Sequence, residues 1–290
     1  MTGLLPLLLA CNETNLGKVQ RDAIAVVLGD FDDMNAVLVA LDVAAVPYDG
    51  FIVQAAYEPE RDRTRRGSLG VTVEMLLGSF DSDGRRDLSQ YGTLFLASGT
   101  RGLGAGQYNN ALVPDDTLLV AQEGEDAPLV RALCDFVEGG GTLVLSDWAY
   151  DVVETCWPDA VSFVGDGDGP DAAQVGVAEA DLVAEVVDEE LAAAFGPTAA
   201  LQMDYSAWSV MRAVGEDVDV LLRGDASYQP DPAEPIVDGT ELPLLVRLQP
   251  GAGTVIYGSF HWGAQNPILA QNLVRALVTT LPAPAATESR

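Results

Sequence analysis

Short apolar runs alternate with amphipathic segments through the first half of the chain. The runs are rich in leucine and β-branched residues and too short for helices, which is typical of strands buried on both faces; they lie at 24–29, 51–55, 91–97 and 142–145. The segments 34–44 and 127–137 carry apolar residues at helical spacing. This alternation predicts an α/β domain that begins with a βαβ unit and has a parallel sheet.

The most distinctive turn follows the second of these helical segments. Three glycines at 139–141 allow a tight turn, the apolar run Thr142–Leu145 predicts a buried strand, and a new helical pattern runs from Tyr150 to Thr155. We name residues 139–151 the elbow. A strand that turns sharply into a helix is where α/β folds expose a reactive side chain, and here that position is Asp147.

The C-terminal half has a different pattern, in which strands dominate. The expected strands are 199–203, 208–213, 218–222, 244–248 and 254–257. A short helix is expected at 188–195 and an amphipathic helix at 268–281, and His261 follows the last strand. No linker divides the chain, so we expect a signal and tether at 1–22, one domain at 23–281 and a disordered tail at 282–290.

The net charge of the chain limits the classes of partner that it can bind. The formal net charge is −29, and a surface this acidic repels nucleic acid and anionic lipid headgroups. The chain has a single histidine and no CxxC pair, so we expect neither a metal site nor a cofactor. The glycine-rich loop 98–106 departs from the dinucleotide fingerprint, and the aspartate-rich stretch 165–171 departs from the EF-hand order. Both are interpreted as plain loops.

The N-terminal residues resemble a signal for export and lipidation. An apolar run ends in Leu8-Leu9-Ala10-Cys11, which resembles the lipobox of bacterial lipoproteins, and polar residues follow it. The resemblance implies a lipid anchor at Cys11, the only contact with a membrane that we expect, and a place in the cell envelope on the periplasmic or outer surface. The alternative is a disordered or short helical N-terminus with an incidental cysteine.

Two further cysteines lie on either side of the elbow. Cys134 falls inside a helical pattern, where we expect it to pack as a small apolar side chain. A disulfide between Cys134 and Cys156 is also possible in an exported protein, because spacing alone does not decide between these states.

Three features together resemble the class I glutamine amidotransferase-like superfamily, in the branch near the trehalose-utilisation proteins. They are the opening βαβ unit, the elbow, and the terminal stretch from Gly253 to His261. The resemblance implies a flavodoxin-like three-layer sandwich with a mostly parallel central sheet and a strand-rich C-terminal half. In that superfamily the elbow holds a nucleophilic cysteine and a late histidine is its base. His261 matches that histidine, and Gly99 resembles the glycine of the oxyanion hole.

The elbow cysteine of the superfamily is replaced here by Asp147. A carboxylate attacks an amide poorly and would form an anhydride, so we expect no glutaminase activity. Three interpretations remain. The one we favour is a non-catalytic amidotransferase-like module of the envelope that binds a protein or a small molecule. The second is a hydrolase using Asp147 and His261, and the third is a structural role for both residues, in which Asp147 caps the following helix and His261 packs near Trp262.

The ends of parallel strands meet at one edge of a sheet, so the residues that follow the predicted strands should share a crevice. We therefore expect a ligand pocket at that edge, lined by Gly99, Thr100, Asp147, Trp148, His261 and Trp262.

Overall fold

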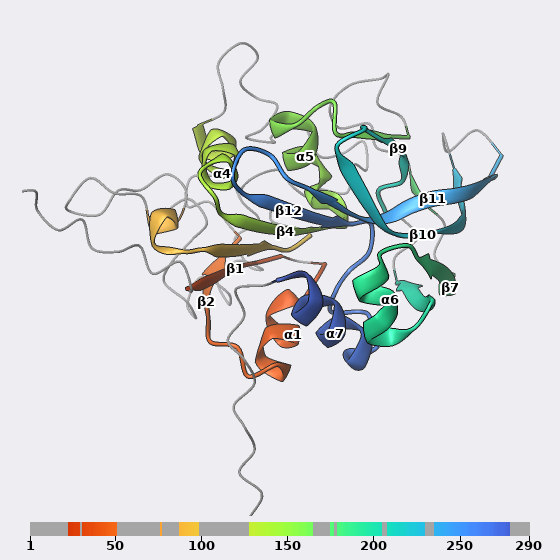
Figure 1. The fold of residues 1–290 in the computed structure, drawn as a ribbon, viewed down its shortest axis with the longest axis horizontal. Coiled ribbons are helices and arrows are strands. Elements are labelled where there is room, and N and C mark those ends of the chain that lie inside the picture. Colours follow the sequence, from red (N-terminus) through yellow and green to blue (C-terminus); the bar gives the residue numbers. More distant parts are fainter. Residues whose placement is uncertain are drawn as a thin grey trace, which may run out of the picture.

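A large mixed β-sheet forms the middle of the molecule, with helices on both faces (Figure 1). The structure is a computed structural model. It describes residues 23–29, 31–50, 76, 87–98, 128–164, 175–176, 179–204, 208–229 and 235–278. The predicted lipobox, the strand at 51–55, and the loops 99–106 and 165–171 lie outside these residues.

The parallel part of the sheet combines three strands that the apolar runs predict, at 24–28, 93–96 and 142–146, with a strand at 45–49 that they do not predict and with the last described strand. Its strands, in spatial order, are β2 (Ala45–Asp49), β1 (Ile24–Leu28), β3 (Thr93–Leu96), β4 (Thr142–Ser146) and β12 (Thr254–Gly258). Thr142 of β4 is in register with both Thr93 and Thr254, so the three strands begin at the same level.

From β12 onward every strand pairing is antiparallel. The order continues with β11 (Val237–Leu248), β10 (Val218–Gln229), β7 (Glu179–Val186) and β8 (Thr198–Met203). The short β6 (Val175–Gly176) pairs with β10, and β5 (Val161–Phe163) and β9 (Met211–Val214) form a small separate sheet. The fold is therefore α/β with a mixed sheet: the prediction of parallel strands holds for the first half, and the strand-rich second half is antiparallel.

Helices cover the two faces in separate groups (Figure 1). On one face lie α4 (Pro128–Glu138) and α5 (Tyr150–Cys156); on the other lie α1 (Met34–Ala40), α6 (Glu189–Phe195) and α7 (Pro267–Leu277). Short 3₁₀ turns occur at Asp87–Gln90 and Asp147–Ala149. None of the helices in the described part of the chain has the length and apolar character needed to span a bilayer.

Alternate side chains of each parallel strand point to opposite faces of the sheet and so pack into two different hydrophobic cores. In β1, Ile24 and Val26 join the core under α1 and α7, while Ala25 and Val27 join the core under α4 and α5. Because successive side chains of a strand point to opposite faces, a strand buried on both sides must be apolar throughout. This explains why the first half of the sequence shows continuous apolar runs.

The first crossover differs from the sequence prediction. The predicted helix 34–44 ends at Ala40, and residues 45–49, for which no strand is predicted, form β2. Pro47 lies inside that strand, and a proline is tolerated there because β2 is the outermost strand on this side of the described sheet. Asp33 caps α1 by accepting a hydrogen bond from the Ala36 N–H at 3.0 Å.

Cys134 and Cys156 form a disulfide that joins α4 to α5. The expectation that Cys134 is only a small apolar side chain is therefore wrong, although its surroundings are indeed buried. The bridge spans the elbow, since β4 and Asp147 lie between the two helices in the chain. It therefore ties together the two helices that flank the strand leading into Asp147.

Replacing both cysteines by serine should lower the free energy of unfolding by about 3 kcal/mol, because a loop of this length gains conformational entropy when the crosslink is removed. Urea denaturation of the variant and of oxidised wild type gives the comparison. Reduced wild type is the control and should match the variant. Equal stability of oxidised and reduced protein would contradict the prediction.

Candidate functional site

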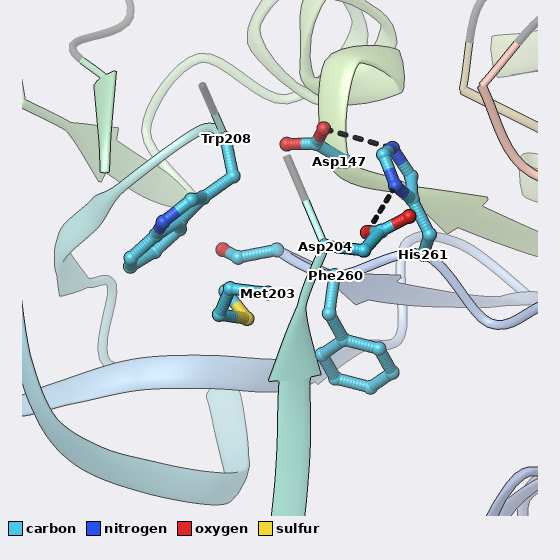
Figure 2. Close-up of a pocket in the computed structure, with 7 residues that line it drawn as sticks. Asp147, Met203, Asp204, Trp208, Phe260 and His261 are labelled. Carbon is cyan, nitrogen blue, oxygen red and sulfur yellow. Dashed lines mark hydrogen bonds and ion pairs between the residues drawn. The ribbon is translucent and has the colours of Figure 1, made fainter. Parts of the chain in front are cut away.

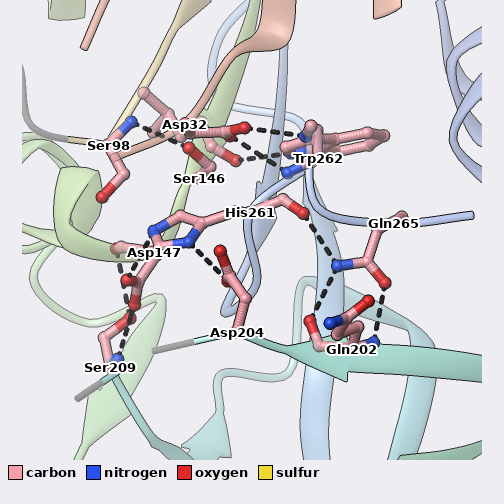
Figure 3. A network of polar contacts seen from close by, with 12 residues as sticks. Asp32, Ser98, Ser146, Asp147, Gln202, Asp204, Ser209, His261, Trp262 and Gln265 are labelled. Carbon is pink, nitrogen blue, oxygen red and sulfur yellow. Dashed lines mark hydrogen bonds and ion pairs between the residues drawn. The ribbon is translucent and has the colours of Figure 1, made fainter. Parts of the chain in front are cut away.

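Polar side chains from several strand ends meet at one edge of the sheet (Figure 3). Asp32, Ser98, Asp147 and His261 follow β1, β3, β4 and β12, which all run in the same direction. The structure thus brings Asp147 and His261 together at the edge where the sequence places them. Parallel strand ends converge in this way because the strands share a direction and a register.

The backbone of Asp147 adopts a conformation that is unusual for an aspartate. Its φ is +40°, in the left-handed region, directly after the extended Ser146 at φ −128°. Such a conformation costs about 1–2 kcal/mol for a residue with a side chain. It turns the chain from β4 into the 3₁₀ turn and then α5, and this is the geometry of a strained strand-to-helix elbow.

Asp147, His261 and Asp204 form a chain of contacts (Figure 2). The His261 Nε2 lies 3.1 Å from Asp147 Oδ2, an ion-pair distance without well-directed hydrogen-bond geometry. The His261 Nδ1 is hydrogen-bonded to Asp204 Oδ1 at 2.8 Å. The side chains of Asp147 and His261 are 0% and 3% exposed, whereas that of Asp204 is 26% exposed. One imidazole is therefore held between a fully buried carboxylate and a partly exposed one.

Burial and charge act in opposite directions on His261. Burial by itself lowers its pKa, but the contacts with Asp147 and Asp204 and the charges of Asp147 and Asp32 outweigh this and raise the pKa of His261 to about 10. Burial raises the pKa of Asp147 and of Asp32, while the charge of His261 opposes both shifts. At neutral pH His261 is thus an imidazolium, in contact with Asp147 and Asp204.

Ser209 and Tyr257 hold the other side of the elbow. Asp147 Oδ1 accepts the Ser209 N–H at 2.7 Å and the Ser209 Oγ–H at 3.1 Å. The Tyr257 hydroxyl donates to the Asp147 carbonyl oxygen at 2.9 Å, and Ser209 Oγ lies beside the Tyr257 hydroxyl. These bonds fix both the backbone and the carboxylate of Asp147. The capping role considered for Asp147 is wrong, because no side chain caps the 3₁₀ turn or α5.

A second set of bonds fixes the loops around the cluster (Figure 3). Asp32 accepts the backbone N–H groups of Trp262 and Gly263 at 3.0 and 2.8 Å, which ties the loop after β1 to the loop after β12. Ser146 Oγ accepts the Ser98 N–H at 2.9 Å. The loop that carries His261 is therefore held by the loop after β1, and the end of β4 that leads into Asp147 is held by the end of β3.

A small pocket opens beside the cluster (Figure 2). The space among its lining residues, about 150 Å³, includes open solvent and is not an enclosed cavity. The lining residues are Asp147, Met203, Asp204, Trp208, Ser259, Phe260 and His261. Two residues expected in the pocket do not line it: Trp148 packs against Tyr150, and Trp262 packs against Phe260. Gly99 and Thr100 lie outside the described residues. Within the described ranges, no group of three or more His, Cys, Asp or Glu side chains is placed to hold a metal ion.

Sequence reasoning missed Asp204 and Ser209. Four antiparallel pairings separate β8 from β12, so β8 runs in the same direction as β12 and its end reaches the same edge. Asp204 directly follows Met203, the last residue of β8. The aspartate at a strand end was visible in the sequence, but the direction of that strand was not.

Comparison with known proteins gives likeness in structure only. No model of a known protein family matches the chain, and neither does any curated protein. A cytoplasmic protein from Salmonella typhimurium is similar to it with 12% identity and a TM-score of 0.48, over 90% of this chain and 100% of that one. PurLQS from Thermotoga maritima is similar with 13% identity and a TM-score of 0.48, over 89% and 97%. A ThuA-like protein from Bacteroides uniformis is similar with 15% identity and a TM-score of 0.40, over 91% and 93%. Likeness this distant says nothing about reaction or ligand.

The raised pKa of His261 predicts how stability changes with pH. The folded pKa of about 10 exceeds the unfolded value of 6.5, so the contribution of His261 is complete below pH 6.5 and is lost as pH rises toward 10. The free energy of unfolding should fall over this window by up to about 5 kcal/mol. Denaturation midpoints measured across the window for wild type and His261→Gln provide the test, and the variant should vary less. An unchanged slope in the variant would contradict the assignment.

Proposed function

We propose that this chain is an amidotransferase-like domain of the flavodoxin-like, three-layer type that lacks glutaminase chemistry and works as a binding or assembly module of the bacterial cell envelope. One observation carries the proposal: the elbow position holds a fully buried carboxylate whose Oδ1 accepts two hydrogen bonds from Ser209 and whose Oδ2 is ion-paired with His261. A side chain held in this way stabilises the edge of the sheet and has no thiolate to offer a glutamine amide.

His261 and the two described cysteines give further support to the proposed loss of glutamine hydrolysis. A general base must be neutral to accept a proton, and His261 with a pKa of about 10 is protonated at neutral pH. Cys134 and Cys156, the two cysteines in the described part of the chain, are joined to each other, so neither supplies a replacement nucleophile.

The proposed location in the cell envelope rests on Cys11 and on the disulfide between Cys134 and Cys156. The stretch Leu8-Leu9-Ala10-Cys11 resembles a lipobox, which would place the mature chain on a lipid anchor at Cys11. A Cys134–Cys156 disulfide suits an oxidising compartment such as the periplasm or the cell surface. The partner would then be an envelope protein or a small molecule that reaches the pocket beside Asp204.

Isolation of the chain from the cell envelope tests its proposed location and its binding of a partner in one experiment. After cross-linking in intact cells, the wild-type chain should be recovered with the membrane fraction, with a lipid mass on Cys11 and a bound partner. Asp204→Asn should reduce capture roughly tenfold, about 1.4 kcal/mol, because the amide keeps the hydrogen bond to His261 but removes the charge at the pocket.

Asp219→Asn is the matched control for the capture, since Asp219 is a carboxylate 55% exposed on the surface and paired with Arg247. Its capture should equal that of wild type. Recovery of an unmodified chain with Met1 intact, or equal capture by Asp204→Asn, would contradict the proposal.

Purified wild-type protein should release no ammonia from glutamine above the rate of buffer, since a carboxylate at the elbow does not form the thioester of the superfamily reaction. A coupled ammonia assay measures this, with Asp147→Asn as the comparison. Glutamine hydrolysis that Asp147→Asn abolishes would refute the loss of glutaminase chemistry.

A second candidate function is a hydrolase that uses Asp147 and His261. The observation in its favour is the hydrogen bond from His261 to Asp204, because a nucleophile, an imidazole and an orienting carboxylate in contact are the arrangement of a catalytic triad. The left-handed φ of Asp147 adds to it, since strained backbone at an elbow is characteristic of nucleophiles.

A further inference from the structure

The two oxygens of Asp147 lie in different environments. Oδ1 receives two donors from Ser209, at 2.7 and 3.1 Å. No hydrogen-bond donor among the described residues is well directed at Oδ2, which lies 3.1 Å from His261 Nε2. One oxygen is therefore held by donors as an oxyanion would be, while the other keeps lone pairs for attack.

We propose that Asp147 is a covalent nucleophile toward a saturated carbon that carries a halide, with Ser209 as the oxyanion donor and Asp204 as the residue that positions His261. This inference rests on the second candidate function. Asp147 Oδ2 and His261 Nε2 would touch the reacting atoms, whereas Asp204 acts through the imidazole.

The substrate class follows from the nucleophile and the walls of the pocket. Attack of a carboxylate on an acyl carbon gives a reactive anhydride, whereas attack on a saturated carbon with a good leaving group gives a stable ester. Met203, Trp208 and Phe260 line the pocket with apolar surface, so the part of a substrate that they would contact is a short alkyl chain. The surrounding carboxylates would repel an anionic substrate.

The first step forms the bond between Oδ2 and carbon and breaks the bond between carbon and halogen, and the halide leaves with the electron pair. Esterification removes the charge of Asp147, one of the groups that keep His261 protonated. His261 then loses its proton to solvent, which balances the charge of the departing halide. The imidazole is left neutral beside the ester, with Nδ1 still bound to Asp204.

In the second step His261 Nε2 takes a proton from water, and the water oxygen attacks the carboxyl carbon of Asp147. Negative charge develops on Oδ1, where the Ser209 N–H and Oγ–H already point. Collapse breaks the ester bond, the alkoxide takes the proton from His261, and an alcohol leaves. The new carboxyl group then gives the second proton of the water to His261, which restores the carboxylate and the imidazolium. One water oxygen stays in the carboxylate, so the sum is halide, alcohol and a proton from alkyl halide and water.

A single turnover in water labelled with heavy oxygen tests this route, using the full chain in excess over bromoethane. The expected result is bromide release, ethanol without the label, and heavy oxygen in the peptide that contains Asp147. Labelled ethanol with unlabelled protein would overturn the covalent step. Absence of bromide release by folded wild type would overturn the whole inference and the hydrolase, while the capture and ammonia experiments on the binding module would stand unaffected.

Variants separate the roles of the other residues. His261→Gln should release one bromide per chain and retain an ethyl group on Asp147, and Ser209→Ala should slow ester hydrolysis by ~10²-fold while the ester still forms. Asp204→Asn should preserve ester formation and shift the pH profile of ester hydrolysis, which a purely structural residue would not do. Asp219→Asn, on the surface, should behave as wild type. Free turnover by His261→Gln, or an unshifted pH profile in Asp204→Asn, would refute the corresponding role.

Discussion

The structure at the sheet edge depends on one interaction, a buried imidazolium held between two carboxylates. His261 is 3% exposed and Asp147 is 0% exposed, and a lone charge in such a place would be strongly destabilising. Each charge is tolerated only because the other is present, with Asp204 as the second partner of the imidazole. Removing either member of the buried pair leaves an uncompensated charge, which usually costs more than the intact pair contributes.

This constraint determines how the surrounding chain is arranged. Asp147 must leave β4 with a left-handed φ so that its carboxylate reaches His261, and Ser209 and Tyr257 hold it in that conformation. Asp32 performs the same task for the loop that carries His261. The polar network is therefore as much a part of the fold as the two hydrophobic cores, since it determines how the loops at the strand ends pack.

The charge of Asp147 distinguishes the two functional proposals. While the carboxylate is ionised, it raises the pKa of His261 and the cluster is a stable structural element, as suits a binding module. If an electrophile neutralises it, His261 becomes a free base beside an ester whose second oxygen already has donors. The same contacts are thus compatible with a structural role and with a catalytic role for Asp147. Reaction with a small alkyl halide distinguishes the two roles.

The sequence by itself determined the buried strands β1, β3 and β4, because a strand covered on both faces must be apolar throughout. It also located the elbow, because strand, glycine and helix signals are local. It also brought Asp147 and His261 to one edge, since parallel strand ends converge. It did not determine the antiparallel half, the Cys134–Cys156 bridge, or the partners Asp204 and Ser209. Those depend on strand order and direction across the sheet, which arise from contacts between residues 62 or 57 positions apart, and no local pattern encodes such contacts.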